Sequence, residues 1–249
     1  MSVIQKWWNR LVTASGKHGY ACDGCGDELF AYPLHRLCKI CEDGLEKNDK
    51  IVCPKCGRKV VSTGVCTTCK SILPAFTRGI SPFVYRAETA SLVNRIKNGD
   101  RRIAFYFAEK MTDKLLCCFP LTGVDLLTLP VPMTAEKRVK RGYNQAETLA
   151  ERVGKCLAEK GINANLHTDV LQRKREIEQQ KHLTLRERKQ NSDGAFHLHR
   201  RKICQGKMVL LIDDILTTGA TGSTCAKLLL HAGAKSVILL TIASLPERK

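Results

Sequence analysis

Paired cysteines dominate the first 70 residues of this 249-residue chain. Eight of its 13 cysteines form four Cys-x-x-Cys pairs, with 12, 11 and 9 residues between successive pairs. Each such turn directs two sulfur atoms to one point, and two turns supply the four thiolates of a tetrahedral zinc site. The spacing predicts two structural Zn²⁺ sites, whose ligands are Cys22, Cys25, Cys38, Cys41, Cys53, Cys56, Cys66 and Cys69.

Disulfides, an iron–sulfur centre and a thioredoxin-like redox pair are the competing interpretations of these cysteines. Disulfides need an oxidising compartment, and the N-terminal residues lack the apolar core of a secretion signal. A redox motif occurs once beside a βαβ unit, rather than four times in succession. Zinc is therefore favoured. Joining the first pair to the second and the third to the fourth is the simplest ligand arrangement, and an interleaved one is the alternative. The other five cysteines lack such spacing and are expected to be core or incidental residues.

An acid pair followed by a threonine-rich loop is the second set of residues that could do chemistry. Residues 209–221 read VLLIDDILTTGAT, in which an apolar strand leads to the acids Asp213 and Asp214 and then to a loop of small residues, Thr217, Thr218, Gly219, Ala220 and Thr221. A loop that follows a parallel strand and opens a helix offers N–H groups and the positive end of the helix dipole to an anion. We expect the loop to bind a monophosphate. The acids, which repel phosphate, would contact hydroxyl groups or Mg²⁺, so the pattern describes a ribose 5-phosphate site.

A capped helix after a strand, with Asp and Thr serving only as turn residues, is the alternative interpretation of this segment. A Walker A loop is excluded because the GxxxxGK[ST] string is absent.

The elements that must position these residues alternate along the chain. Apolar periodicity predicts helices at 87–97, 103–119, 146–157 and 227–230. Apolar runs predict strands at 124–131, 166–171, 208–212 and 237–243. Strands separated by helices indicate an α/β fold with a parallel, doubly wound sheet. Because the cysteine pairs end before residue 75, we expect a cysteine-rich zinc-binding module at 1–75 and the α/β domain at 76–249.

The chain is strongly basic. Lys and Arg outnumber Asp and Glu by 41 to 24, a formal charge of +17, which two zinc ions on eight thiolates would lower to about +13. Residues 171–202 hold ten Lys and Arg against four Asp and Glu, and a short helix there would carry Arg186, Arg188 and Lys189. These cations could clamp a pyrophosphate, form an electrostatic track for nucleic acid, or be a solvated basic face.

A second basic cluster, formed by Lys137, Arg138, Lys140 and Arg141, is expected in a loop before a helix. Its place after the first core strand favours a role in binding an anion.

Residues 209–221 resemble the 5-phosphoribosyl-1-pyrophosphate (PRPP) binding motif of type I phosphoribosyltransferases throughout its hydrophobic-Asp-Asp-x-x-Thr-Thr-Gly-x-Thr core. Three more features resemble the ComF/GntX family of competence proteins. They are the cysteine pairs, VPMTAEKRVKRGYNQAE at 131–147, and the stretch from Gln180 through Arg188 and Asn191 to Phe196. Together they cover nearly the whole chain, in the family's order.

The resemblance implies roles for particular residues. Asp213 and Asp214 would be catalytic and contact the ribose hydroxyls, and the loop from Thr217 to Thr221 would hold the 5-phosphate. The loop around Thr134 to Lys137, with Arg138 beside it, would lie near the pyrophosphate. Mg²⁺ would bridge pyrophosphate and ribose oxygens. The family reaction replaces pyrophosphate at the anomeric carbon with a nitrogen nucleophile, through an oxocarbenium-like transition state that Asp214 could stabilise.

Three functions follow from these observations. The resemblance implies a PRPP-binding protein of the ComF type that acts in natural competence and handles imported single-stranded DNA on the cytoplasmic side, with DNA-import machinery at the inner membrane as a candidate partner. A nucleotide salvage phosphoribosyltransferase is an alternative, although zinc sites are no part of salvage chemistry. A non-catalytic adaptor that senses PRPP and binds nucleic acid is another. We expect a cytoplasmic protein, because no apolar stretch reaches the length of a membrane span, and lean toward an enzyme.

Overall fold

The computed structural model describes residues 20–29, 37–121, 123–173 and 195–247. The chain divides into two compact units, residues 1–45 and 46–249. The smaller unit contains an antiparallel pair, β1 (Tyr20–Ala21) with β2 (Glu28–Leu29), and the short helix α2 (Lys39–Asp43). The first cysteine quartet lies in this unit and the second lies in the larger one. The division between the two units thus falls between the two cysteine quartets.

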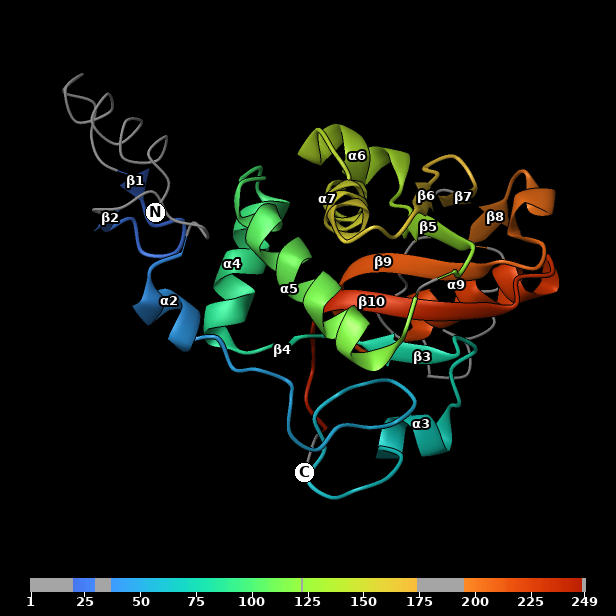
Figure 1. Ribbon diagram of the computed structural model, residues 1–249, viewed down its shortest axis with the longest axis horizontal. Coiled ribbons are helices and arrows are strands. Elements are labelled where there is room, and N and C mark those ends of the chain that lie inside the picture. The colour runs from blue at the N-terminus through green and yellow to red at the C-terminus, as the bar shows by residue number, and fades with distance from the viewer. Residues whose placement is uncertain (1–19, 30–36, 122, 174–194, 248–249) are drawn as a thin grey trace. The chain divides into compact units, whose positions relative to one another are not determined.

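A six-stranded sheet forms the centre of the larger unit (Figure 1). The strand order is β3-β10-β9-β5-β6, with β4 also paired to β10, and every pair in this sheet is parallel. The strands are β3 (Arg78–Ile80), β4 (Phe83–Val84), β5 (Leu126–Pro130), β6 (Ala164–Leu166), β9 (Met208–Leu216) and β10 (Ser236–Ser244). A separate antiparallel pair consists of β7 (Leu171–Arg173) and β8 (Phe196–Leu198).

Helices cover both faces of the sheet, with α9 behind it and α5 in front in Figure 1. Among the described residues of this unit, the helices are α3 (Thr67–Ser71), α4 (Ala87–Lys97), α5 (Ile103–Cys118), α6 (Ala135–Arg141), α7 (Gln145–Glu159), α9 (Ala220–His231) and the 3₁₀ turn η1 (Arg201–Cys204). Leu211 and Leu239 share a core cluster with Cys225 and Leu229 of α9, while their sheet neighbours are buried as well. Consecutive burial at 209–212 in β9 and at 237–244 in β10 requires cover on both faces of the sheet. The expected parallel, doubly wound α/β fold is thus confirmed.

Local sequence signals account for the helices that flank the site. In α7, Ala146, Leu149, Ala150 and Val153 recur at helical spacing and are buried. The Asn144 side chain caps this helix by accepting from the N–H of Ala146 at 3.0 Å. The predicted helices at 87–97, 103–119 and 146–157 are confirmed to within three residues at each end.

Two predictions of local structure are wrong. The strand expected at 166–171 is not formed, because the chain leaves the sheet after Leu166 and begins β7 only at Leu171. The apolar residues at the two ends of that stretch therefore belong to different strands. The basic cluster expected in a loop lies instead in α6. Thr134 caps this helix by accepting from Lys137 N at 3.3 Å, and Gly142 ends it at a φ of 77°.

Among the described residues, no helix combines the length and the apolar character that crossing a membrane demands.

Candidate functional site

Strand β9 extends beyond its neighbour β5 at the carboxyl edge of the sheet. The last residue pair between the two strands joins Pro130 to Ile212, whereas β9 continues to Leu216. After β5 the chain turns away, with Val131 N bonded to Ile212 O at 2.8 Å. The two acids that follow Ile212 therefore lie at the edge where ligands of parallel sheets bind.

Asp214 is a buried carboxylate with two side-chain partners from distant segments. Its Oδ2 atom lies 3.2 Å from Lys97 Nζ at the end of α4. The same oxygen accepts a hydrogen bond from Gln145 Nε2, at the start of α7, at 3.3 Å. Its Oδ1 atom accepts from the backbone N–H of Ile215 at 2.7 Å. Only 8% of the residue is exposed, and burying a carboxylate is costly unless it has hydrogen-bond and ion-pair partners such as these.

Asp213 is held by its neighbour. Its Oδ1 atom accepts from the backbone N–H of Asp214 at 2.9 Å. Burial, followed by the adjacent charge of Asp214, raises the pKa of Asp213 well above its ordinary value. A nearby cation favours the charged form of such a carboxyl group, so this position is suited to a site where a divalent ion or a hydroxyl ligand arrives.

The threonine-rich loop leads directly from β9 into α9. Gly219 caps the helix with a φ of 81°, a backbone conformation that side chains disfavour. Thr217, Thr218 and Thr221 are exposed, and Thr218 Oγ1 accepts from Ala220 N at 3.3 Å. The first N–H groups of a helix lack partners within the helix and carry partial positive charge. The loop therefore presents hydroxyl and N–H donors to an anion, next to the acid pair.

The residues expected near a pyrophosphate lie in α6. Lys137 is half-buried and Arg138 is exposed. The guanidinium of Arg138 makes a two-pronged pair with Glu147, at 2.7 and 3.0 Å. An anion that recruits Arg138 would have to compete with Glu147 for it.

Lys97 and Gln145 are site residues that the sequence analysis did not single out for chemistry. Gln145 lies in the segment at 131–147 that resembles the competence family, which is a signal that could have found it. Lys97 ends a helix just before Asn98 and Gly99, and its sequence surroundings give no comparable signal.

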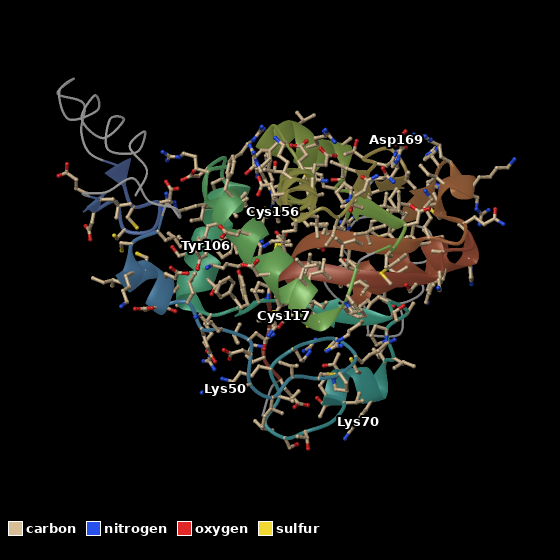
Figure 2. All side chains as sticks on the ribbon, viewed as in Figure 1. Lys50, Lys70, Tyr106, Cys117, Cys156 and Asp169 are labelled. Carbon is tan, nitrogen blue, oxygen red and sulfur yellow. The ribbon has the colours of Figure 1, made fainter. Side chains whose placement is uncertain are left out.

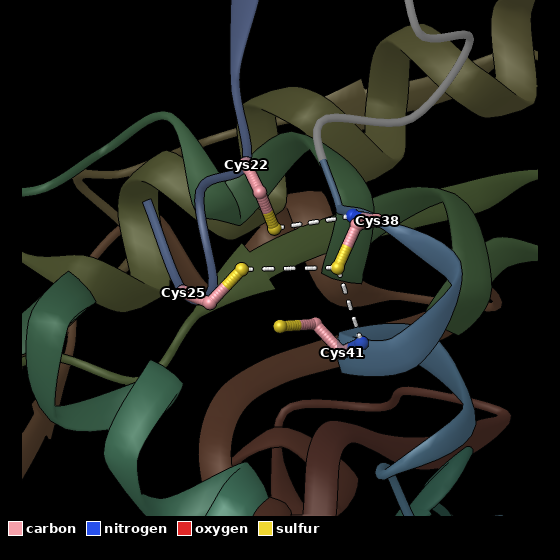
Figure 3. Close-up of side chains that lie close together, drawn as sticks. All are labelled: Cys22, Cys25, Cys38 and Cys41. Atoms are coloured by element: carbon pink, nitrogen blue, oxygen red, sulfur yellow. Dashed lines mark hydrogen bonds between the residues drawn. The ribbon is translucent and has the colours of Figure 1, made fainter. Parts of the chain in front are cut away.

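The eight paired cysteines form two quartets, each able to hold a metal ion. Within each quartet all sulfur atoms lie within 4.8 Å of one another. The first joins Cys22, Cys25, Cys38 and Cys41 (Figure 3), and the second joins Cys53, Cys56, Cys66 and Cys69. The simpler of the two predicted ligand arrangements is therefore the one the fold adopts.

Distances and hydrogen bonds in the quartets fit zinc. The sulfur atoms of Cys25 and Cys38 are 3.8 Å apart, and those of Cys56 and Cys66 are 3.6 Å apart. Four thiolates bound tetrahedrally at the usual zinc–sulfur distance would be separated by about 3.8 Å. Backbone N–H groups of Gly24 and Cys38 donate to Cys22 Sγ at 3.2 and 3.1 Å, as expected where a sulfur carries negative charge.

The acidity of particular thiols supports the same conclusion. Burial alone would raise the pKa of Cys22, but backbone N–H bonds from its neighbours lower it to about 6. In the second quartet, Cys53 is lowered in the same way to a pKa of about 7. Burial and the neighbouring Cys56 raise the pKa of Cys69. The hydrogen bonds to Cys22 and Cys53 thus favour their thiolate forms, and a bound cation would favour ionisation of the other sulfur atoms as well.

The quartets differ in burial. All four cysteines of the second quartet are buried, whereas in the first only Cys22 is. The second quartet also belongs to the core cluster on the α9 face of the sheet.

The remaining five cysteines have no common site. Cys204 and Cys225 are buried in the core. Cys117 on α5 and Cys156 on α7 lie on different helices (Figure 2). Cys118 is half-buried at the end of α5. The basic residues Arg186, Arg188 and Lys189 lie outside the described residues.

The chain is similar to a family of phosphoribosyl transferase domains and to several proteins named for competence or DNA utilization. Residues 104–249 match the phosphoribosyl transferase domain family. The DNA utilization protein YhgH of Escherichia coli is 27% identical over 205 residues, which span 81% of this chain and 87% of that protein. The competence protein ComFC of Bacillus subtilis is 28% identical over 222 residues, 84% of this chain and 85% of its own. Competence protein F of Haemophilus influenzae is 31% identical over 110 residues, 44% of this chain and 46% of its own.

Proposed function

The chain belongs to the phosphoribosyl transferase domain family, as its acid pair and loop predicted, and on this premise we propose that it binds PRPP with Mg²⁺ at the carboxyl edge of the sheet. Asp213 and Asp214 contact the ribose hydroxyls in this proposal, and the loop from Thr217 to Thr221 holds the 5-phosphate. The observation that carries the proposal is that β9 brings the acid pair and a helix-opening loop in succession to one edge of the sheet.

The chemistry of the two parts matches the two ends of a ribose 5-phosphate. A carboxylate accepts hydrogen bonds from hydroxyl groups but repels phosphate, so Asp214 suits the sugar and not the phosphate. Thr218 and the N–H groups that open α9 are donors, which suit phosphate oxygens. Lys97, held against Asp214 at 3.2 Å, adds a cation beside the place where the pyrophosphate would lie.

The acid pair also fits Mg²⁺, which prefers carboxylate oxygens and keeps several waters. When bound, Mg²⁺ would neutralise the pyrophosphate and hold it against the ribose. Asp213 and Asp214 are the residues that would hold the ion, directly or through water.

The proposed reaction is displacement at the anomeric carbon. A nitrogen nucleophile forms the new C–N bond, and the C–O bond to pyrophosphate breaks, with the electron pair leaving on pyrophosphate. Positive charge develops on the ribose in such a transition state, and the proposed role of the Asp214 carboxylate is to stabilise that charge. Lys137 and Arg138 of α6 are proposed to contact the leaving pyrophosphate. Arg138 would then give up its ion pair with Glu147 and bind the pyrophosphate instead.

We further propose that the protein acts in natural competence, on the cytoplasmic side, where it handles imported single-stranded DNA. The names of its relatives, a DNA utilization protein and two competence proteins, support this role. The net charge of +17 supports it too, because a basic surface attracts nucleic acid. Arg186, Arg188 and Lys189 are the proposed contacts to DNA. DNA-import machinery at the inner membrane is the proposed protein partner.

The decisive experiment is calorimetric titration of the zinc-loaded protein with PRPP and Mg²⁺. We expect binding by the parent protein and its loss in Asp214→Asn. Asp125→Asn is the matched control, since Asp125 precedes β5 at the opposite edge of the sheet, where it pairs with Lys207 at 3.4 Å. Equal PRPP affinity in the parent and in Asp214→Asn would refute the assignment of the site.

A second titration addresses the DNA. Charge reversal at Arg186, Arg188 and Lys189 should weaken binding of single-stranded DNA and flatten its salt dependence, because each lost phosphate contact reduces the slope by about 1. A shift of PRPP affinity on adding DNA would link the two sites. If affinity for DNA and its salt slope both stayed unchanged, the DNA contacts would lie elsewhere.

A further inference from the structure

Arg58 connects the second cysteine quartet to the threonine-rich loop. Its side chain is buried, with 5% of the residue exposed. The Nε atom donates to Cys56 Sγ at 3.3 Å, and Nη2 donates to the backbone carbonyl of Thr217 at 2.7 Å. One guanidinium thus contacts both a sulfur atom of the quartet and the first residue of the loop. Arg58 and Thr217 are 159 residues apart in the chain.

Charge explains why this arginine can be buried. A guanidinium stays protonated in proteins, so it needs a counter-charge when it is removed from water. Four thiolates around one divalent zinc ion carry a net charge of about −2. The metal-loaded quartet is therefore a suitable anionic partner for Arg58. The bond from Arg58 to the Thr217 carbonyl is charge-assisted and stronger than one between neutral groups.

The quartet cannot shift independently of the sheet, because its backbone lies directly on β3. A Cβ atom added to Gly79 would lie 2.4 Å from the carbonyl oxygen of Cys56, and one added to Gly57 would lie 2.3 Å from Gly79 O. Gly79 N also donates to Lys55 O at 2.9 Å. The buried Asn48 side chain donates to Gly57 O at 2.7 Å.

The loop rests on the segment that follows the quartet. The fully buried ring of Phe76 lies beneath Gly219, so that a Cβ atom there would meet it at 3.5 Å. Ala75 N donates to Ser223 Oγ, in the first turn of α9, at 2.9 Å. Arg58 and the segment at 75–76 therefore both contact this region, Arg58 at the start of the loop and the segment at Gly219 and the first turn of α9.

We propose that the second cysteine quartet is a positioning element for the anion-binding loop, and that Arg58 is the positioning residue that transmits its effect. Loss of metal from this quartet weakens the hydrogen bond from Arg58 to the Thr217 carbonyl. The N–H and hydroxyl donors of the loop then become less ordered. The first quartet has no part in this effect. The inference rests on the proposed function only for the identity of the anion, because the order of the loop can be measured without a ligand.

The test compares Arg58→Met with the parent by amide hydrogen exchange over residues 216–222. Loss of the charge-assisted bond should accelerate exchange in this segment about tenfold. Arg58→Lys should give an intermediate result, because an ammonium group lacks the planar fork that reaches both partners. Lys59→Met is the matched control: the lysine is adjacent in sequence but forms an ion pair with Glu46, so exchange in the loop should match the parent.

Ligand binding provides a second measurement. Ribose 5-phosphate carries only the phosphate that the loop would hold, so Arg58→Met should weaken its binding and that of PRPP by the same factor, about tenfold. If the parent binds neither ligand, the proposed function fails while the exchange data still decide the role of Arg58. If Arg58→Met does not fold, the hydrogen-exchange rates of Arg58→Lys decide whether Arg58 orders the loop.

The metal contribution is tested by removing one ligand from each quartet. Cys66→Ser should accelerate exchange in the loop, and Cys25→Ser should leave it at the parental rate. Unchanged loop exchange in folded Arg58→Met, or equal effects of the two cysteine substitutions, would overturn the proposal.

Discussion

Lys97 Nζ lies 3.2 Å from Asp214 Oδ2 and joins the end of α4 to the carboxyl edge of the sheet. Gln145, the first residue of α7, donates to the same oxygen at 3.3 Å. A cation and an amide therefore orient the Asp214 carboxylate before any ligand binds. Such preorganisation lowers the cost of aligning a charged group when the substrate arrives.

Lys97→Met should destabilise the protein and weaken PRPP binding. Removing the cation leaves a buried carboxylate with an amide as its remaining side-chain partner, a loss that we expect to cost about 1–2 kcal/mol of unfolding free energy. Urea denaturation measures this loss, and calorimetry measures the affinity. Lys207→Met is the control, because its partner Asp125 is 63% exposed and such surface pairs contribute about 0–1 kcal/mol. Equal losses in both variants would contradict the special role of Lys97.

Gly79→Ala should separate the second quartet from the sheet. The added methyl group would lie 2.4 Å from a backbone carbonyl that cannot move aside, so we expect a loss of about 3 kcal/mol or more. Gly154→Ala is the matched control in α7, where a Cβ atom would meet nothing within 4 Å. There the substitution should stabilise the helix by about 0.5–1 kcal/mol. Thermal unfolding checks both values, and a tolerated Gly79→Ala would contradict the backbone contact.

Zinc should be released in two phases. We expect two equivalents of zinc per chain, one in each quartet. A chelator should remove the first equivalent from Cys22, Cys25, Cys38 and Cys41, of which only Cys22 is buried, before it reaches the fully buried second quartet. A metallochromic indicator follows the release. Cys25→Ser should abolish the fast phase and leave the slow one, whereas a single phase in the parent would show that burial does not control the release.

Acid should remove a contribution from Asp100. Burial alone would raise the pKa of Asp100, but hydrogen bonds from Arg102 and Arg95 outweigh it and lower the pKa below its ordinary value of 3.8. A lowered folded-state pKa stabilises the fold above the unfolded-state value, and that contribution is lost as the pH falls through the folded-state value. We therefore expect Asp100→Asn to be less stable than the parent at pH 7.

The difference between Asp100→Asn and the parent should shrink below a pH of about 4, as the Asp100 carboxylate of the parent becomes protonated. Urea denaturation between about pH 3 and pH 7 measures this trend, and loss of zinc at low pH affects both proteins alike. Asp113→Asn is the control, because its ion pair with Lys160 is exposed on both sides. A constant difference across the range would refute the assignment.

Structural features that depend only on neighbouring residues in the chain could be predicted from the sequence. A Cys-x-x-Cys turn depends only on the four residues that form it, so the eight cysteines able to hold metal could be predicted by position. The strand, acid pair and loop at 209–221 form one continuous segment, and α4, α5 and α7 each carry their own apolar spacing. The family assignment follows from these segments, and the match at 104–249 confirms it.

Short segments that depend on their neighbours were harder to predict. The apolar residues at 166–171 belong to two strands, because β6 ends where its pairing with β5 ends at Leu166. The basic cluster at 137–141 looked like a loop, although Thr134 and Gly142 supply a cap at each end of α6. The two capping residues in the sequence predict a helix, but the dense positive charge was interpreted as a loop.

The sequence by itself determined the paired cysteines, the parallel α/β architecture and the family, because these depend on residue types and on spacing within segments of the chain. Only the tertiary structure decided which cysteine pairs come together in a quartet, that Lys97 and Gln145 meet at Asp214, and that Arg58 joins the second quartet to Thr217. The physical reason is that these contacts join residues far apart in the chain. They exist only once the strand order and the packing of helices on the sheet have brought their partners within hydrogen-bonding distance.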